Sequence, residues 1–341
     1  MALSAAHEGG CCTFEVRART CLHFAITNVP NLLPISAIVP TRNRALPFRR
    51  TLESLANQSV QPVEIIVVDA SDDDSTANLC SSRIPGLESE IRYFRAHEAG
   101  AATQRNEAMR HAREEIILFM DDDILFEPAC IRRLYDGLTV SPDVGGVVAM
   151  ITNQRYLPPG RVSRMIFRFM AGRASESYAG RVLGPAVTLL PDDHDSLPEI
   201  VPVEWLCSCC ALYRRQAMPD PPFGGNFTGY SMMEDLTLSL IVGRQWKLAN
   251  VRTARILHDS QPGSHKSDPA VVGEMSVINR HYVMTCVLGR RGMSDYAKLV
   301  LWIAFGQVAA LLTPSQWGTY PRRVVGELRG LRAIMGRAVD G

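Results

Sequence analysis

The chain has 341 residues, with 36 Lys and Arg against 35 Asp and Glu, a formal net charge of +1 and a hydrophobic fraction of 46%. This composition excludes a chain that is disordered over most of its length. The even charge balance argues against a dedicated nucleic-acid binder, so we expect no nucleic-acid partner. The length predicts about two domains, or one large α/β domain with additions.

Nine cysteines are scattered along the chain, and charged residues stand in the first thirty positions, where a secretory signal would need an apolar core. We therefore expect a reducing, cytoplasmic setting. The cluster Cys207-Ser208-Cys209-Cys210 has no second pair at the spacing of zinc ligands. We interpret these cysteines as small buried side chains rather than a zinc site.

From residue 35 onwards, short β-rich runs alternate with helical segments. Alternating strands and helices predict an α/β fold with a mostly parallel, Rossmann-like sheet flanked by helices, whose ligands bind at the carboxyl ends of the strands. The predicted strands are 35–39, 63–68, 91–94, 115–120 and 144–151, and the predicted helices are 46–57, 100–113 and 128–138.

Prolines interrupt the pattern after residue 151, and the later elements are less regular. We predict strands at 201–206, 247–251 and 255–257, and helices at 234–244 and 271–288, with two more helices within 295–337. The organisation is then an N-terminal arm of unknown order (1–33), two halves of an α/β unit (34–150 and 151–268) and a C-terminal helical region (269–341).

Three consecutive carboxylates, Asp121 to Asp123, follow the apolar run that ends at Met120. Their mutual repulsion would be relieved by a divalent cation, and oxygen ligands suit Mg²⁺ or Mn²⁺. On an extended segment Asp121 and Asp123 point the same way and Asp122 points away. The alternative is a solvated loop before a helix N-terminus.

Three further features carry candidate chemistry. Asp69 ends a predicted strand and is interpreted either as a nucleoside contact or as part of a polar loop. Glu234 and Asp235 begin a predicted helix after a glycine-containing segment. They are interpreted either as acids that stabilise the first turn of the helix or as a source of a general base in a cleft. His258 follows a strand and gains functional meaning only from its neighbours.

Taken in order, these features resemble the family-2 glycosyltransferases of the GT-A fold. The resemblance covers roughly 35–260 and rests on 38–44 (the opening strand and turn), 67–76, 100–106 (an Arg-Asn motif), 119–123 (the metal-binding signature), Glu234-Asp235 and His258. The chain departs from the family at Ala70, where a second acid is common.

The resemblance implies inverting transfer of a sugar from a nucleotide diphosphate sugar, UDP-linked by family habit, to a hydroxyl of a glycan or lipid-linked acceptor. It implies a bound Mn²⁺ or Mg²⁺. The implied catalytic residues are Asp235 as general base and Glu234 as its neighbour; the metal ligands are Asp123, His258 and Asp121; and the nucleotide contacts are Pro40, Thr41, Arg42, Asp69, Arg105 and Asp121.

Some of these assignments have alternatives. Arg105 is either a nucleotide contact or a structural ion pair, and Trp205 either stacks on the acceptor sugar or lies in the core. The loop after His258 is either a lid over the diphosphate or a solvated connector. Two rival functions are a nucleotidyltransferase, which would carry glycines after the first strand, and a catalytically silent binder, which would lack Asp123 or Asp235.

The segment 299–312 is nearly all apolar, yet shorter than the roughly 20 residues of a membrane-spanning helix. Arginines dominate the charges that follow, up to residue 337. Three interpretations remain: a buried helix, an oligomer contact, or a helix lying on an anionic membrane surface through 296–337. The membrane interpretation places the protein on the cytoplasmic face and favours a lipid-linked acceptor.

Overall fold

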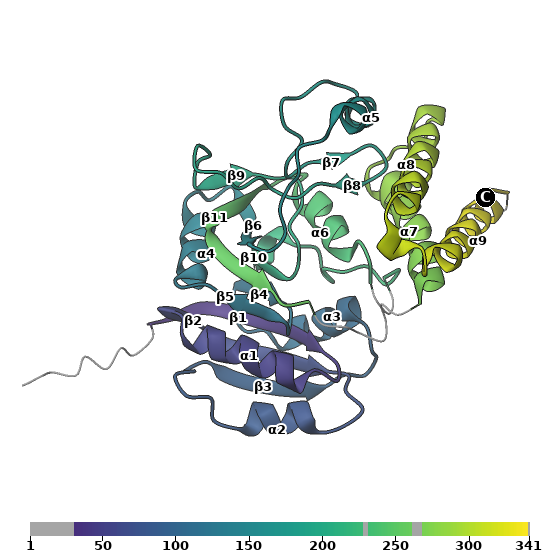
Figure 1. Cartoon of the computed structure of the whole chain (residues 1–341). Coiled ribbons are helices and arrows are strands. Elements are labelled where there is room, and N and C mark those ends of the chain that lie inside the picture. Colours follow the sequence, from purple (N-terminus) through teal and green to yellow (C-terminus); the bar gives the residue numbers. More distant parts are fainter. Residues whose placement is uncertain (1–30, 228–230, 261–267, 340–341) are drawn as a thin grey trace, which may run out of the picture.

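The computed structural model describes residues 31–227, 231–260 and 268–339 (Figure 1). Its centre is a nine-stranded sheet in the order β3-β2-β1-β4-β10-β6-β11-β5, and β9 pairs with a different stretch of β11 from β5. Six of these strands (β1, β2, β3, β4, β6 and β11) run in one direction, while β5, β9 and β10 run antiparallel to their neighbours. The predicted α/β class with a mostly parallel sheet is confirmed.

The strands of this sheet are β1 (Asn31–Thr41), β2 (Val60–Asp69), β3 (Glu90–Arg95), β4 (Ile116–Met120), β5 (Ile124–Phe126), β6 (Val144–Ile151), β9 (Ile200–Pro202), β10 (Cys210–Arg214) and β11 (Lys247–His258). A two-stranded ribbon consists of β7 (Val182–Leu183) and β8 (Val187–Thr188). The helices that contribute to the argument below are α1 (Ala45–Ala56), α2 (Ser75–Ser81), α3 (Ala101–His111), α4 (Cys130–Thr139), α5 (Arg161–Ala171), α6 (Glu234–Val242), α7 (Pro269–Tyr282), α8 (Met293–Leu311) and α9 (Tyr320–Val339).

The alternation of side chains along the strands divides the core into two layers. Ala37 and Val39 of β1 pack with α1 and α4 on one face of the sheet. Ile38 points to the other face and packs with α3 and α6. Because both faces are covered by helices, the central strands are apolar on both sides, which explains their unbroken runs of Ile and Val. The helices thereby fix the carboxyl ends of β1 and β4 beside the N-terminal part of α6 (Figure 1).

The structure corrects several boundaries. β10 is absent from the prediction, although it pairs antiparallel with both β4 and β6. The predicted strands 247–251 and 255–257 form one strand, β11, with a register shift between Val251 and Arg255. The predicted strand 201–206 shrinks to Ile200–Pro202, and β1 begins at Asn31, before the predicted end of the arm at residue 33. The halves 34–150 and 151–268 share one sheet because β10 and β11 complete it.

The C-terminal region forms the expected helices. Small residues let α9 approach α7 closely: a Cβ added at Gly326 would lie 1.9 Å from the carbonyl oxygen of Ala270. α8 packs against α5, where Leu301 and Trp302 cover the small cluster around Phe167 and Met170. Within the described part of the chain, the helices fall short of the length and apolarity needed to cross a membrane.

Candidate active site

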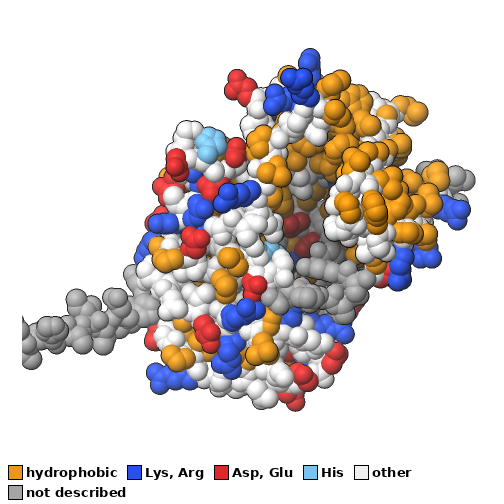
Figure 2. Space-filling model, viewed as in Figure 1, with side chains coloured by type: hydrophobic (Ala, Val, Ile, Leu, Met, Phe, Trp, Pro, Cys, Tyr) orange, Lys and Arg blue, Asp and Glu red, His pale blue; other side chains and the backbone are white. Residues whose placement is uncertain are grey.

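A cavity of about 760 Å³ opens at the carboxyl ends of β1 and β4, and Figure 2 shows it as a deep hollow in the surface. Its walls come from segments that lie far apart in the sequence. The lining includes Pro40, Thr41, Arg42, Arg44, Gln104, Arg105, Asp121, Asp122, Asp123, Trp205, Cys207, Glu234, Asp235, His258 and Arg280. Three of the four features singled out in the sequence line this one cavity: the acidic triplet, the Glu234-Asp235 pair and His258. The fourth, Asp69, lies outside the lining.

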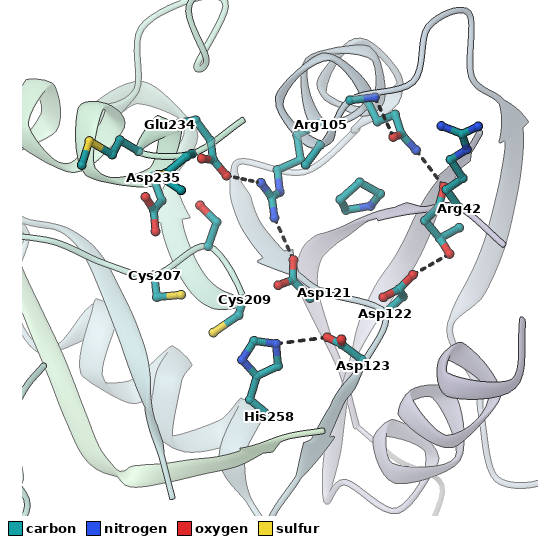
Figure 3. Close-up of a pocket in the computed structure, with 18 of the residues that line it drawn as sticks. Arg42, Arg105, Asp121, Asp122, Asp123, Cys207, Cys209, Glu234, Asp235 and His258 are labelled. Atoms are coloured by element: carbon teal, nitrogen blue, oxygen red, sulfur yellow. Dashed lines mark hydrogen bonds and ion pairs between the residues drawn. The ribbon is translucent and has the colours of Figure 1, made fainter. Parts of the chain in front are cut away.

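Asp121, Asp123 and His258 form a cluster whose ligand atoms all lie within 4.8 Å of one another. Nε2 of His258 lies 3.1 Å from Oδ1 of Asp123, and the backbone N–H of Asp259 donates to the carbonyl oxygen of Asp123 (Figure 3). β11 therefore holds the histidine against the end of β4. Two carboxylates and one imidazole are a donor set that fits Mn²⁺ well and accepts Mg²⁺ through the oxygens.

Asp122 lies outside this cluster, as predicted, although the triplet stands in the turn between β4 and β5 and not on an extended strand. Its carboxylate accepts a 2.6 Å hydrogen bond from Oγ1 of Thr41 and pairs with Nη1 of Arg44 at 3.0 Å (Figure 3). Burial raises the pKa of Asp122 to about 6, although Arg44 and Thr41 oppose this shift. The same Arg44 nitrogen lies 3.0 Å from Oδ2 of Asp123. Arg44 thus balances part of the triplet's charge, a role that the sequence analysis did not assign.

Arg105 lies between two of the acidic groups (Figure 3). Its Nη2 pairs with Oδ1 of Asp121 at 2.7 Å and its Nη1 with Oε1 of Glu234 at 2.9 Å, and its side chain is only 4% exposed. The guanidinium lies 5.7 Å from the centre of the Phe223 ring. These contacts support the structural ion pair, the alternative to nucleotide binding; the nucleotide role stays a prediction.

We expect Arg105→Met to lower the free energy of unfolding by about 3 kcal/mol, because it leaves Glu234 and the partly exposed Asp121 without their shared cation. Urea denaturation at pH 7 measures the effect. The control is Arg113→Met, which removes an exposed ion pair with Glu90 and a 3.9 Å contact with Glu64, whose closer partner Arg92 remains. It should change stability by less than about 1 kcal/mol. Equal effects of the two substitutions would contradict this assignment.

Glu234 and Asp235 occupy the first turn of α6, and the residues before them turn sharply. Ser231 and Met233 have positive φ values of 54° and 74°, in the left-handed region that such side chains seldom adopt. Burial raises the pKa of both carboxyls, most strongly for Glu234, which also faces Asp235; Arg105 opposes both shifts. Within the described residues, the carboxylate of Asp235 accepts a hydrogen bond from the backbone of Leu236, whereas that of Glu234 binds Arg105. Asp235 is the acid whose carboxylate remains available to a ligand.

The remaining predicted nucleotide contacts divide into two groups. Pro40, Thr41 and Arg42 line the cavity. Asp69 is fully buried behind it and accepts hydrogen bonds from Ser71 and from the hydroxyl of Tyr93. Its direct contact with a nucleoside stays a prediction, and the structure gives it the role of organising the end of β2.

Trp205 lines the cavity, and its indole N–H donates to the carbonyl oxygen of Leu189. The predicted lid after His258 lies mostly in 261–267, outside the described residues.

Among the described residues the cysteines form no metal cluster. The hydrogen bond with Cys207 and burial raise the pKa of the Cys209 thiol well above its ordinary value, which agrees with inert packing side chains.

The sequence of the chain is similar to those of known glycosyltransferases. A family model described as "Glycosyl transferase family 2" matches residues 36–218. The chain is 31% identical over 91 residues to the GalNAc(5)-diNAcBac-PP-undecaprenol beta-1,3-glucosyltransferase of Campylobacter jejuni, covering 26% of this chain and 29% of that protein. It is 27% identical over 138 residues to a PGL/p-HBAD biosynthesis glycosyltransferase of Mycobacterium bovis, covering 39% and 54%. The match therefore spans less than two thirds of either relative.

Among solved structures, the mannosyltransferase PcManGT from Pyrobaculum calidifontis, in complex with GDP-Man and Mn²⁺, superposes with a TM-score of 0.50 at 16% identity and covers 87% of both chains. This likeness concerns the fold, which is of the GT-A type. Because the family model covers more than half of the residues, including the segment that carries the acidic triplet, the chain belongs to glycosyl transferase family 2.

Proposed function

We propose that the protein transfers a sugar, with inversion, from a nucleotide diphosphate sugar to a hydroxyl group of an acceptor. One observation carries this proposal: the carboxylate of Asp235 lines the same cavity as the Asp121, Asp123 and His258 cluster. Inversion by a single displacement needs one base on the acceptor side and charge stabilisation on the leaving-group side. The cavity offers both from different elements, α6 for the base and β4 with β11 for the ligands.

Asp123, His258 and Asp121 would hold a divalent cation, Mn²⁺ or Mg²⁺. When bound, such a cation stabilises the negative charge that develops on the departing diphosphate. We place the nucleotide against Pro40, Thr41 and Arg42, which line the cavity at the end of β1. Asp69 supports this wall from behind through Ser71. The UDP base expected from the resemblance stays part of the proposal.

In the transfer step, the acceptor oxygen forms a bond to the anomeric carbon while the bond to the diphosphate oxygen breaks. Asp235 accepts the proton of the acceptor hydroxyl during this step. Glu234 is the weaker candidate for this role because its carboxylate already binds Arg105. It instead orients the first turn of α6 through that ion pair.

The test of this proposal is the thermal unfolding of the full chain with a panel of nucleoside diphosphates, each with Mn²⁺, Mg²⁺ or a chelator. A ligand present at about 100 times its Kd stabilises the fold by about 2.7 kcal/mol. We expect stabilisation by one diphosphate, dependent on the cation, followed by transfer to an acceptor when the matching nucleotide sugar is added. Stabilisation without turnover would favour the silent binder. Transfer of the nucleotidyl group would favour the nucleotidyltransferase.

We propose that the acceptor is a glycan or a lipid-linked glycan. Apolar side chains exposed beside the cavity favour the lipid-linked kind. Figure 2 shows hydrophobic side chains gathered over α5, α8 and α9 beside the hollow. On α5, Val162, Met165 and Phe169 are 69%, 74% and 48% exposed. On α8 and just after it, Val300, Leu311, Leu312 and Trp317 are also exposed. We call the exposed apolar side chains of α5 and α8, together with Leu312 and Trp317, the apolar face.

The charges on α5 are basic. This helix contains Arg161, Arg164 and Arg168 and no acidic residue. Lys298 of α8 lies 5.6 Å from the ring of Phe169, so the two helices present one surface. Apolar side chains bordered by arginines match an anionic bilayer surface. We infer that the membrane surface predicted through 296–337 also includes α5, and we assign the cytoplasmic face of a membrane as its place.

We expect the protein to cosediment with vesicles of phosphatidylcholine and phosphatidylglycerol more than with phosphatidylcholine alone. The double substitution Met165→Glu and Phe169→Glu should lower binding about tenfold or more, since each buried apolar side chain contributes about 1.5–3 kcal/mol. The control is Leu46→Glu, an equally exposed apolar residue on α1, at 77%.

A protein that ignores both kinds of vesicle but forms concentration-dependent dimers, lost in the double variant, would identify the apolar face as an oligomer contact instead. Light scattering after gel filtration distinguishes this outcome.

A further inference from the structure

Arg280 of α7 lines the cavity together with Thr188, Trp205 and Leu236. It was not among the residues that the sequence singled out. Leu236 directly follows the proposed base Asp235 in α6, so this part of the wall belongs to the acceptor side of the cavity. The chemistry of Arg280 therefore bears on which acceptor the site takes.

The guanidinium of Arg280 is held by neutral groups. Its Nη1 donates to the carbonyl oxygens of Pro185, at 3.2 Å, and of Ala186, both in the turn between β7 and β8. The ring centre of Trp302, from α8, lies 5.7 Å from its Cζ. These three contacts fix the position of the guanidinium from two sides and leave Nε and Nη2 without a hydrogen bond to any described residue.

The other arginines of the cavity wall pair with carboxylates: Arg42 with Asp72, Arg44 with Asp122 and Asp123, and Arg105 with Asp121 and Glu234. For Arg280, the described residues place no carboxylate within ion-pair distance. Burial without such a partner lowers its pKa to about 10, so it stays charged at neutral pH. A fixed cation that lacks an anion and faces a cavity is suited to bind an anionic ligand group.

We propose that Arg280 binds a phosphate group carried by the acceptor. The inference rests on the proposed function, because it assigns this wall to the acceptor. In the proposed function, the divalent cation held by Asp121, Asp123 and His258 would supply the counter-charge for the donor's diphosphate. Trp205 and Leu236 provide the neighbouring apolar surface, so the occupant combines a phosphate with a sugar or alkyl portion. A phosphate-linked lipid at the apolar face has this chemistry.

The experiment is a calorimetric titration of the full chain with hexyl phosphate, in the presence of a chelator so that the metal cluster contributes nothing. Hexyl glucoside is the uncharged counterpart. We expect Arg280→Met to weaken hexyl phosphate binding about tenfold or more and to leave hexyl glucoside unchanged. Arg280→Lys, which keeps the charge but not the planar fork, should fall between the two.

The matched control is Arg290→Met. Arg290 also donates to a carbonyl oxygen of the same turn, that of Gly184, yet it does not line the cavity. We expect its substitution to leave hexyl phosphate binding unchanged. Equal losses in Arg290→Met and Arg280→Met, or no loss in either, would overturn the proposal.

A second titration, with UDP and Mn²⁺, separates the two sources of phosphate. Unchanged affinity in Arg280→Met supports the acceptor, whereas a loss larger than that for hexyl phosphate assigns Arg280 to the donor and overturns the proposal. If the wild type binds no nucleotide but binds hexyl phosphate through Arg280, the anion site stands and the proposed transfer fails. The two failures are therefore distinguishable.

Discussion

Asp235→Asn should abolish sugar transfer and leave metal-dependent nucleotide binding intact. The amide cannot accept the acceptor proton, and loss of a general base typically slows a reaction about 10²–10⁴-fold. The donor-binding residues lie at the carboxyl ends of β1 and β4 and on β11, while Asp235 is on α6, so its substitution should not disturb them. Turnover of the nucleotide sugar identified by the diphosphate panel, together with the Kd of that diphosphate, measures both effects.

Glu234→Gln is the control for this assignment, because it changes the neighbouring carboxylate and weakens the contact with Arg105. We expect it to reduce turnover less than Asp235→Asn. Retained transfer in Asp235→Asn, with loss in Glu234→Gln, would assign the base to Glu234.

The pH dependence follows from the raised pKa of the pair. Asp235 must be ionised to accept a proton, so kcat/KM should fall as pH decreases through a midpoint above the ordinary carboxyl value of 3.8. The two carboxyls titrate together, so the midpoint belongs to the pair. A profile that stays flat down to pH 4 would contradict the proposed role.

The same shift predicts a change in stability. A carboxyl whose pKa is higher in the folded than in the unfolded protein destabilises the fold above its folded pKa, and this effect disappears as pH falls to the unfolded value. Asp235→Asn should therefore raise the free energy of unfolding by about 1–2 kcal/mol at pH 8 and by much less at pH 4. Urea denaturation at both pH values measures the difference.

Asp123→Ala should remove the stabilisation that Mn²⁺ and the nucleoside diphosphate give together. Asp123 is 2% exposed in its side chain and contacts both His258 and Arg44. Its loss takes one ligand from the cluster, and we expect the diphosphate affinity in Mn²⁺ to fall about 100-fold. Arg44 keeps its partner Asp122 in this variant, so the local fold should persist.

Calorimetric titration of the diphosphate with and without Mn²⁺ tests this expectation. Asp74→Asn is the control, since Asp74 is an exposed acid that pairs with Arg95 outside the cavity. Unchanged Mn²⁺-dependent affinity in Asp123→Ala would make the triplet an ordinary polar loop.

Several features follow from the sequence because their causes are local. The alternation of apolar residues around Ile38 predicts a strand covered on both faces, and the structure confirms it. The sequence also predicts that Asp121 and Asp123 share a side. The structure brings both into one cluster with His258, although the triplet lies in a turn after β4. The ordered motifs from 38 to His258 identify the family. Each of these conclusions depends on neighbours within a few residues, or on the order of short motifs along the chain.

Other features depend on residues that only the folded chain brings together. β10 was missed because its partners in β4 and β6 lie about 60 to 100 positions earlier, and the sequence pattern of five residues does not reveal them. Arg105 pairs with Glu234 across 129 positions, a contact that supports the structural ion pair and that the motif alone does not reveal. Asp69 lies outside the cavity lining, where it accepts hydrogen bonds from Ser71 and from Tyr93 on the neighbouring strand β3.

The sequence by itself determined the α/β class and the family. It also predicted the acidic and histidine residues that the structure brings into one cavity, although Asp69 lies outside the lining. The tertiary structure showed that Arg105 binds the carboxylate of Glu234 and not that of Asp235. It also showed that Arg280, which has no carboxylate partner among the described residues, lines the cavity. The physical reason is that residue type and period act along the chain, whereas charge pairing and burial depend on distances through space. Those distances are set only when the helices cover both faces of the sheet.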